Sequence, residues 1–191
     1  MPVRRKLNSE YRSREYLTLD EVNRLIDAAE LRPSRHPIRD KALLLLMFRH
    51  GLRLIDAAGL RWDAIMLAER RIMIHRLKGS KSGQHPLKDD EVEALGQLRQ
   101  AYPGSQYLFP NERGGNLTRA AISRIVERCG EIAELPLPVH AHMLRHACGY
   151  HLANQGLDTR LIQDWLGHRN IEHAVRYTKL NPKRFEEISW G

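Results

Sequence analysis

The stretch HAHMLRHACGYHL, residues 140–152, places four histidines and one arginine close together and interleaves them with Leu144 and Leu152. This spacing predicts a helix that begins just after His140 and continues to about Gly156. Imidazoles crowded in this way around an arginine suit three uses: they bind a metal, pack in the core, or contact a phosphate. The rest of the chain helps to decide between these uses.

Composition and charge narrow the class of protein. The chain has 191 residues, 42% of them apolar, which suits one globular domain. Its net charge is +8 and its pI is about 9.8, so we expect a polyanionic partner, above all nucleic acid. Cys129 and Cys148 stand in no metal-ligand spacing, and no signal peptide precedes the basic start MPVRRK. These features predict a cytoplasmic, reduced protein.

Helical patterns dominate and are interrupted by one β segment. Thr18 and Glu21 have capping-box spacing at the start of one helix, and Pro37 begins another that stops at Gly51. The apolar run ALLLLMF, residues 42–48, is far shorter than a membrane span and indicates a core helix. Further helices are expected at 54–60, 88–101, 118–129 with Gly130 as the stop, 159–166 and 171–178. The segment RRIMIHRLKGSKSGQHPL, residues 70–87, is typical of a β-hairpin. The expected fold class is mainly α with a small β-hairpin or β-sheet, an α+β fold.

A metal site is one reading of the histidine-rich stretch. His142 and His146 are four residues apart and would share a helix face, as zinc ligands do. No glutamate follows His142 in the zincin pattern, however, and no third ligand is placed by spacing. We therefore predict no bound metal. Ordinary surface or core histidines remain the other alternative.

A phosphate site is favoured by residues elsewhere in the chain. His142 and Arg145 are three apart on the expected helix, so both could address one anion. Arg53 follows a helix stop, and the stretch LGHRNIEHAVRYTK supplies His168 and Tyr177. Arginine binds phosphate oxygens in a bidentate manner, and histidine transfers protons near neutral pH. Together with a lysine in the hairpin turn, these residues could hold a phosphodiester and attack it without a metal.

Four segments carry a resemblance to a known family: GLRLIDAAGLRW (51–62), RLKGSKSGQHPL (76–87), HMLRHACGYHLA (142–153) and LGHRNIEHAVRYT (166–178). Together they resemble the catalytic domain of the tyrosine recombinase (phage integrase) family, in that family's order of Arg, Lys, His-x-x-Arg, His and Tyr. The likeness covers roughly residues 18–180 and is most similar to the small fimbrial phase-switch recombinases.

The resemblance implies a role for each residue of the set. Tyr177 is the expected nucleophile, Arg53 and Arg145 the contacts to the scissile phosphate, and Lys78 the general acid for the leaving 5′ oxygen. Lys81, in the same turn, is the competitor for the acid role. The arginines would stabilise the charge of the pentavalent state, so neither a cofactor nor a metal is expected. The 3′-phosphotyrosyl bond would conserve the energy for religation through a Holliday junction.

Four further residues complete the expected site. His142 and His168 belong to the pocket, with His142 as the expected proton acceptor, and His146 is expected behind them. The family usually has a glutamate where this chain has Asp56, which we expect to orient Arg53 from a second shell of contacts.

DNA and further copies of the chain are the implied partners. DNA contacts are expected from Arg4, Arg5, Lys6, Lys81, Arg160 and Arg169. Residues 1–16 would form a basic arm, 17–180 the catalytic domain, and 181–191 a tail with Phe185, Ile188 and Trp190 that is exchanged with a neighbouring copy. The resemblance implies double-stranded DNA with inverted-repeat sites, a homotetramer on DNA, an accessory DNA-bending protein, and a cytoplasmic location at the prokaryotic nucleoid. It implies no membrane association.

Two other functions stay open at this point. A type IB topoisomerase-like enzyme would nick and close DNA by the same chemistry without joining two sites. A non-catalytic DNA-binding regulator would explain the charge and the helices but would leave the Arg, His and Tyr set without a purpose. Recombination, with inversion of a DNA segment as one outcome, is the function that the resemblance favours.

Overall fold

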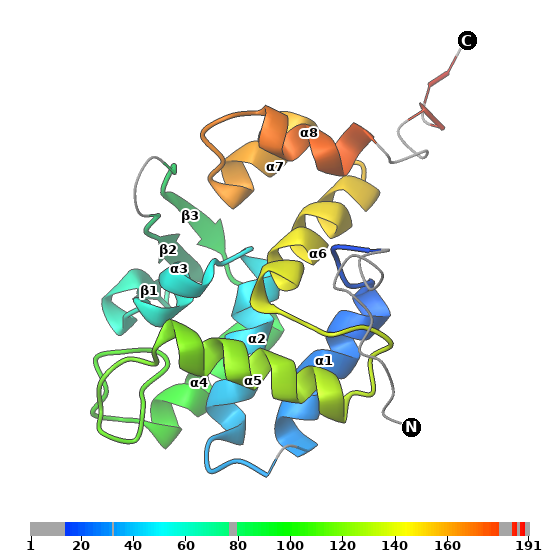
Figure 1. The fold of residues 1–191 in the computed structure, drawn as a ribbon. Helices are drawn as coiled ribbons and strands as arrows, with labels where there is room; N and C mark the ends of the chain where they lie inside the picture. Colours follow the sequence, from blue (N-terminus) through cyan, green and yellow to red (C-terminus); the bar gives the residue numbers. More distant parts are fainter. Residues whose placement is uncertain (1–13, 32, 77–79, 180–184, 187, 190–191) are drawn as a thin grey trace, which may run out of the picture.

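The computed structural model describes residues 14–31, 33–76, 80–179, 185–186 and 188–189. The elements run, in chain order, α1 (Leu19–Leu31), α2 (Pro37–Arg49), α3 (Leu54–Ala58), the 3-10 turn η1 (Trp62–Ala64), β1 (Ile65–Met66), β2 (Arg71–Ile74), β3 (Gly83–Pro86), α4 (Asp89–Ala101), α5 (Arg119–Ile132), α6 (Ala141–Asn154), α7 (Thr159–Leu166) and α8 (Glu172–Lys179). Helices enclose the core, and the small sheet lies at one side, as Figure 1 shows. The α+β class is as predicted.

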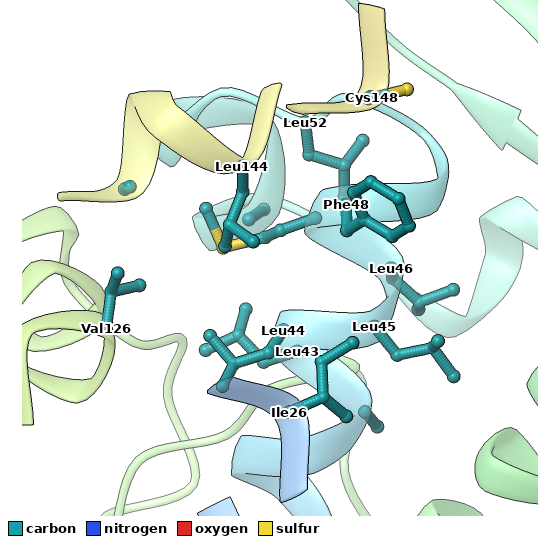
Figure 2. Packing of buried hydrophobic residues seen from close by; sticks show 14 of the residues in the cluster. Ile26, Leu43, Leu44, Leu45, Leu46, Phe48, Leu52, Val126, Leu144 and Cys148 are labelled. Atoms are coloured by element: carbon teal, nitrogen blue, oxygen red, sulfur yellow. The ribbon is translucent and has the colours of Figure 1, made fainter. Parts of the chain in front are cut away.

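Helix α2 is the centre of the core. Leu43, Leu44, Leu46 and Met47 are at most 1% exposed, and the helix packs against α1, α4 and α6. Figure 2 shows its leucines among side chains from α1, α5 and α6. A helix that is apolar on every side is stable only when it is surrounded by protein. The predicted core helix is thus confirmed. Among the residues that the structure describes, every helix is too short or too polar to serve as a membrane span.

The start of α1 has the predicted capping box. The Thr18 backbone N–H donates to Glu21 Oε2 over 2.8 Å, and the Glu21 N–H donates to Thr18 Oγ1 over 3.3 Å. This exchange satisfies two N–H groups that a helix start leaves without partners. Burial raises the pKa of Glu21, but hydrogen bonds from Thr18 and Arg14 outweigh it and lower that pKa below its usual value. The carboxylate therefore stays ionised where it caps the helix.

The β segment forms a three-stranded antiparallel sheet in the order β1-β2-β3. The predicted hairpin is present as β2 and β3, with Ile72 opposite His85. The short strand β1, whose Ile65 pairs with Ile72, was not predicted, because two residues are too few to show an alternating pattern. Ile72 and Ile74 lie on the buried face. Lys78 belongs to the segment between β2 and β3 and lies outside the described residues.

The expectation that α5 stops at Gly130 is wrong. The helix begins as predicted at the Thr118 cap, whose Oγ1 accepts from the Ala121 N–H over 3.1 Å, but it continues to Ile132. Gly130 serves a different purpose. A Cβ atom there would lie 2.8 Å from Val139 Cγ2, so the glycine permits the segment before α6 to pack closely against α5.

Replacing Gly130 with alanine should therefore destabilise the fold, although alanine favours a helix by about 1 kcal/mol over glycine. The clash with Val139 should outweigh that gain and leave a net loss of about 1–3 kcal/mol in the free energy of unfolding, measured by urea denaturation. In a Val139→Ala background the same substitution should be neutral or stabilising. An equal loss in both backgrounds would contradict the close contact.

Candidate active site

An open pocket of about 550 Å³ gathers the predicted site residues from four separate segments. It is lined by Arg53, His142, Arg145, His146, His168, Glu172, His173, Arg176 and Tyr177. The lining comes from the start of α3, from α6, from the turn after α7 and from α8. Among the expected catalytic side chains, Lys78 is the one that lies outside the described residues. The expected DNA contacts Arg4, Arg5 and Lys6 also lie outside them. The sequence prediction did not include Glu172, His173 and Arg176.

Arg145 lies at the base of the pocket and is only 1% exposed. Its Nη1 donates to the Gly51 carbonyl over 2.5 Å and its Nη2 to the Leu166 carbonyl over 2.8 Å. Burial, with the nearby charges of Arg76 and Arg53, lowers its pKa to about 10, so it remains a cation at neutral pH. A guanidinium has five N–H donors, so Arg145 retains donors for an anion in the pocket.

Arg53 is the residue that precedes α3, and its side chain points to the hairpin. Its Nη1 donates to Ser80 Oγ over 2.7 Å, and its backbone N–H donates to Asp56 Oδ2 over 3.0 Å. Asp56, which we expected to orient Arg53, bonds to the main chain of Arg53 rather than to its guanidinium, and it also pairs with Arg76 at 2.7 Å.

Arg76 is a buried cation that the sequence reasoning missed. It pairs with Asp56 and donates to the carbonyls of His50 at 3.0 Å and of Trp165 at 3.3 Å. These carbonyls belong to the ends of α2 and α7, so Arg76 ties both helices to the segment that follows β2. A signal was present in the sequence: Arg76 continues the alternation of Ile72 and Ile74, which places it on the buried face.

Tyr177 is buried in the wall of the pocket, with 2% of its surface exposed. Its hydroxyl lies 2.9 Å from His146 Nδ1, and its ring meets Tyr150 edge-to-face at 5.0 Å. A Cβ atom on Gly149 would come within 2.7 Å of the ring, so this glycine permits the contact of α8 with α6. Burial raises the pKa of Tyr177 to about 12, although the charge of Arg145 opposes this. The phenol is thus neutral at physiological pH.

Two histidines beside Tyr177 are neutral at physiological pH. Burial, with the charges of His142 and Arg176, lowers the pKa of His146 to about 4. Burial and Arg145 lower that of His168 to about 3. His168 lies nearly parallel to the Tyr177 ring, and its buried Nδ1 makes no hydrogen bond within the described part of the chain. A buried nitrogen of this kind in a pocket wall can bond to a ligand atom.

His142 is the more exposed member of the histidine pair on α6. Its ring meets that of His146 edge-on, with centroids 4.4 Å apart. Partial desolvation and the charge of Arg145 lower its pKa as well. The expected proton acceptor was His142, but the imidazole in contact with the Tyr177 hydroxyl is that of His146.

The remaining predicted residues among those described lie on the surface. Arg160 and Arg169 are exposed, and the Lys81 ammonium lies 3.7 Å from an Asp164 carboxylate oxygen. Within the described ranges, no group of three or more His, Cys, Asp or Glu side chains is arranged to hold a metal ion.

Comparison with known proteins decides the family. The model of the phage integrase family matches residues 15–184. The chain belongs to that family. It is 44% identical over 188 residues to the type 1 fimbriae regulatory protein FimB of Escherichia coli K12, covering 96% of this chain and 93% of FimB. The fimbriae regulatory protein FimE of the same strain is also 44% identical, over 178 residues, with 90% and 89% of the two chains covered.

Larger relatives share the fold and the enzyme class. The tyrosine recombinase XerD of Bifidobacterium longum is 38% identical over 189 residues, which are 91% of this chain and 60% of XerD. The crystal structure of XerA recombinase superposes with a TM-score of 0.77 at 27% identity, over 90% of this chain and 63% of XerA. The fold is therefore that of tyrosine recombinase catalytic domains, and the chain is an enzyme of the site-specific tyrosine recombinase class, as the sequence motifs predicted.

The neutral histidines make stability depend on pH. An unfolded histidine binds a proton below about pH 6.5, whereas folded His146 and His168 stay neutral down to about 4 and 3. Between these values protonation favours the unfolded chain, so the free energy of unfolding should fall as pH decreases, by up to about 1.4 kcal/mol per pH unit for each histidine. Urea denaturation between pH 7 and about 4 measures this slope. His168→Gln should flatten it, and an unchanged slope would contradict the burial of a neutral imidazole.

Proposed function

We propose that this chain cleaves and rejoins DNA strands at specific sites through Tyr177, with a 3′-phosphotyrosyl intermediate. The observation that supports this role is the position of the Tyr177 hydroxyl in one pocket with Arg53, Arg145 and His168. A phosphodiester in that pocket would meet two guanidinium groups and an unpaired imidazole nitrogen beside an oxygen nucleophile.

The proposed chemistry divides among few groups. The Tyr177 oxygen attacks the scissile phosphorus, the bond from phosphorus to the 5′ oxygen breaks, and Lys78 gives that oxygen a proton. Arg53 and Arg145 stabilise the added charge of the pentavalent state. Their guanidinium groups do not titrate near neutral pH, so both arginines keep the positive charge that this stabilisation requires. The 5′ hydroxyl of a second strand then reverses these steps and completes the exchange.

His146 receives the Tyr177 proton in this proposal. Its Nδ1 contacts the hydroxyl at 2.9 Å, which is within the reach that proton transfer requires. His142, the acceptor expected from the sequence, touches His146 edge-on and is more exposed, so it can pass the proton to solvent. His168 would bond a phosphate oxygen through its buried Nδ1.

The partners are proposed from the relatives and from charge. The solved structure of XerH, with a TM-score of 0.75 at 26% identity and 50% of its chain spanned, is a complex with its difH substrate. The likeness to FimB and FimE favours a DNA inversion between inverted repeats. We further propose a homotetramer on DNA, an accessory DNA-bending protein, and action at the nucleoid in the cytoplasm.

The ends of the chain have proposed roles as well. The basic arm with Arg4, Arg5 and Lys6 would contact phosphates together with Arg160 and Arg169. In the tail, the described Phe185 and Ile188 are 60% and 52% exposed. Apolar side chains so placed would gain by packing against a neighbouring copy, which would close the assembly.

Incubation with the genomic DNA that flanks the coding sequence, followed by sequencing of the rearranged junctions, tests the function. Tyr177→Phe should bind DNA with unchanged affinity but form no covalent adduct. Lys78→Ala should also block cleavage, because the 5′ alkoxide is a poor leaving group. On a strand with sulfur in place of the bridging oxygen, the Lys78 variant should regain cleavage and the Tyr177 variant should not.

Lys81→Ala is the matched control for the general acid. If Lys81→Ala shows the sulfur rescue and Lys78→Ala does not, the acid is Lys81. Cleavage and closure of one site without joined junctions would assign a topoisomerase-like activity, and binding without an adduct would assign a DNA-binding regulator.

A second prediction tests the position of the nucleophile. In Gly149→Ala, the new methyl group would come within 2.7 Å of three Tyr177 ring atoms, so the ring must move. A displacement of about 1 Å should slow adduct formation by roughly 100-fold while DNA affinity stays unchanged. Gly96→Ala is the control, since it adds a methyl group to α4 where nothing lies within 4 Å. Equal rates for the two variants would refute this placement of Tyr177.

A further inference from the structure

We propose that Glu15 and Tyr16, on the segment before α1, are positioning residues that hold the nucleophile's helix α8 against α6. This inference rests on the proposed role of Tyr177. The segment of Arg14, Glu15 and Tyr16, called the junction segment below, is far from Tyr177 in sequence yet contacts both helices that enclose it. The segment lies in the part of the chain expected to be a DNA-binding arm, and sequence reasoning gave it no part in the active site.

The junction segment is fastened to the body of the fold. Arg14 Nη2 donates to Glu21 Oε1 over 2.5 Å, and Glu21 in turn caps the first turn of α1. The Arg14 guanidinium also lies 5.8 Å from the centre of the Tyr16 ring, and Leu17, directly after it, is 2% exposed. The segment thus has a fixed support on α1 from which it can restrain other elements.

Tyr16 reaches Tyr177 through one intermediate ring. Its ring centroid lies 4.0 Å from that of Tyr150 on α6, with the two planes tilted by 32°. Tyr150 meets Tyr177 edge-to-face at 5.0 Å, one residue after the glycine on which Tyr177 packs. The Tyr150–Tyr177 pair has the edge-to-face geometry that aromatic pairs prefer, and Tyr16 contacts Tyr150, so the three rings restrain each other's positions. Loss of the Tyr16 ring would free Tyr150 to move away from the nucleophile.

Glu15 restrains α8 directly. Its Oε2 lies 2.5 Å from Nη2 of Arg176, the residue before Tyr177. Both side chains are about half exposed, at 56% and 43%, so the ion pair alone contributes little to stability. Its effect lies in its position, because a helix of eight residues does not hold its place without tertiary contacts. Tyr16, which contacts α6, and Glu15, which contacts α8, together form a strap across the two helices.

The strap contacts none of Arg53, Arg145 and His168, the groups assigned to the phosphate, and Glu15 meets the pocket lining only through Arg176. Its removal should therefore slow the nucleophilic step and leave DNA binding and the remaining pocket intact. This separation distinguishes a positioning role from a role in folding, which would lower all of these properties together.

The test uses the full chain with Tyr16→Ala, Tyr16→Phe and Glu15→Gln. Tyr107→Ala is the matched control, because it removes a ring that contacts an arginine, Arg61, at 5.2 Å on another part of the surface. Hydrogen exchange of the α8 backbone amides is measured without DNA. Adduct formation is measured in a single turnover at saturating concentrations of a nicked duplex that carries the mapped recombination site, and DNA affinity is measured separately.

Tyr16→Ala should accelerate exchange in α8 and slow adduct formation by about tenfold, with DNA affinity unchanged. Tyr16→Phe should restore both properties, Glu15→Gln should give a smaller change in the same direction, and Tyr107→Ala should change neither. Exchange in α8 that is equal in all variants would overturn the strap, and so would accelerated exchange with an unchanged rate of adduct formation. If the wild-type chain forms no adduct, the proposed function fails, whereas the exchange data still decide whether the junction segment holds α8.

Discussion

Two buried arginines organise the structure, because they donate hydrogen bonds to the carbonyl groups at the ends of two helices. The last carbonyls of a helix have no partner within it, and in the interior they need donors. Arg145 donates to the carbonyls of Gly51 and Leu166, and Arg76 donates to those of His50 and Trp165. The C-terminal ends of α2 and α7 therefore meet around two guanidinium groups. Both turns need glycine there: Gly51 and Gly167 have positive φ angles, and a Cβ on Gly167 would lie 2.5 Å from the Lys81 carbonyl oxygen.

The same arrangement sets the electrostatics of the pocket. Asp56 neutralises Arg76 at 2.7 Å, and Glu15 pairs with the pocket residue Arg176 at 2.5 Å. Arg145 and Arg53 contribute further positive charge to the pocket. Their charge adds to burial in keeping His168 neutral. A pocket with fixed cations and neutral imidazoles is suited to an anion, since the arginines bind it and the imidazoles donate to it or take up protons. The groups that build the fold are thus the groups that select the ligand's charge.

Patterns in the sequence predicted the helices and several residues of the pocket. The capping box at Thr18, the apolar helix α2 and the convergence of Arg53, Arg145, His168 and Tyr177 all followed from spacing or from the family resemblance, and the structure brings these four residues to one pocket. What was not predicted came from tertiary contacts. Gly130 does not end α5, because it permits the close approach of Val139, and Asp56 also pairs with Arg76, whose burial favours a counter-ion. The contacts of Glu15 and Tyr16 link segments that no sequence window contains together.

In the proposed reaction, loss of the proton from the Tyr177 hydroxyl depends on the bound substrate. Burial raises the pKa of the phenol to about 12 and lowers that of its neighbour His146 to about 4, so proton transfer between them is strongly unfavourable while they face each other alone. A phosphodiester anion beside His146 would stabilise the imidazolium and raise that pKa. The bond that forms to phosphorus would remove the need for a free phenolate. Attack and proton transfer are therefore expected to occur together, and only when phosphate lies between the arginines, which protects Tyr177 from reaction elsewhere.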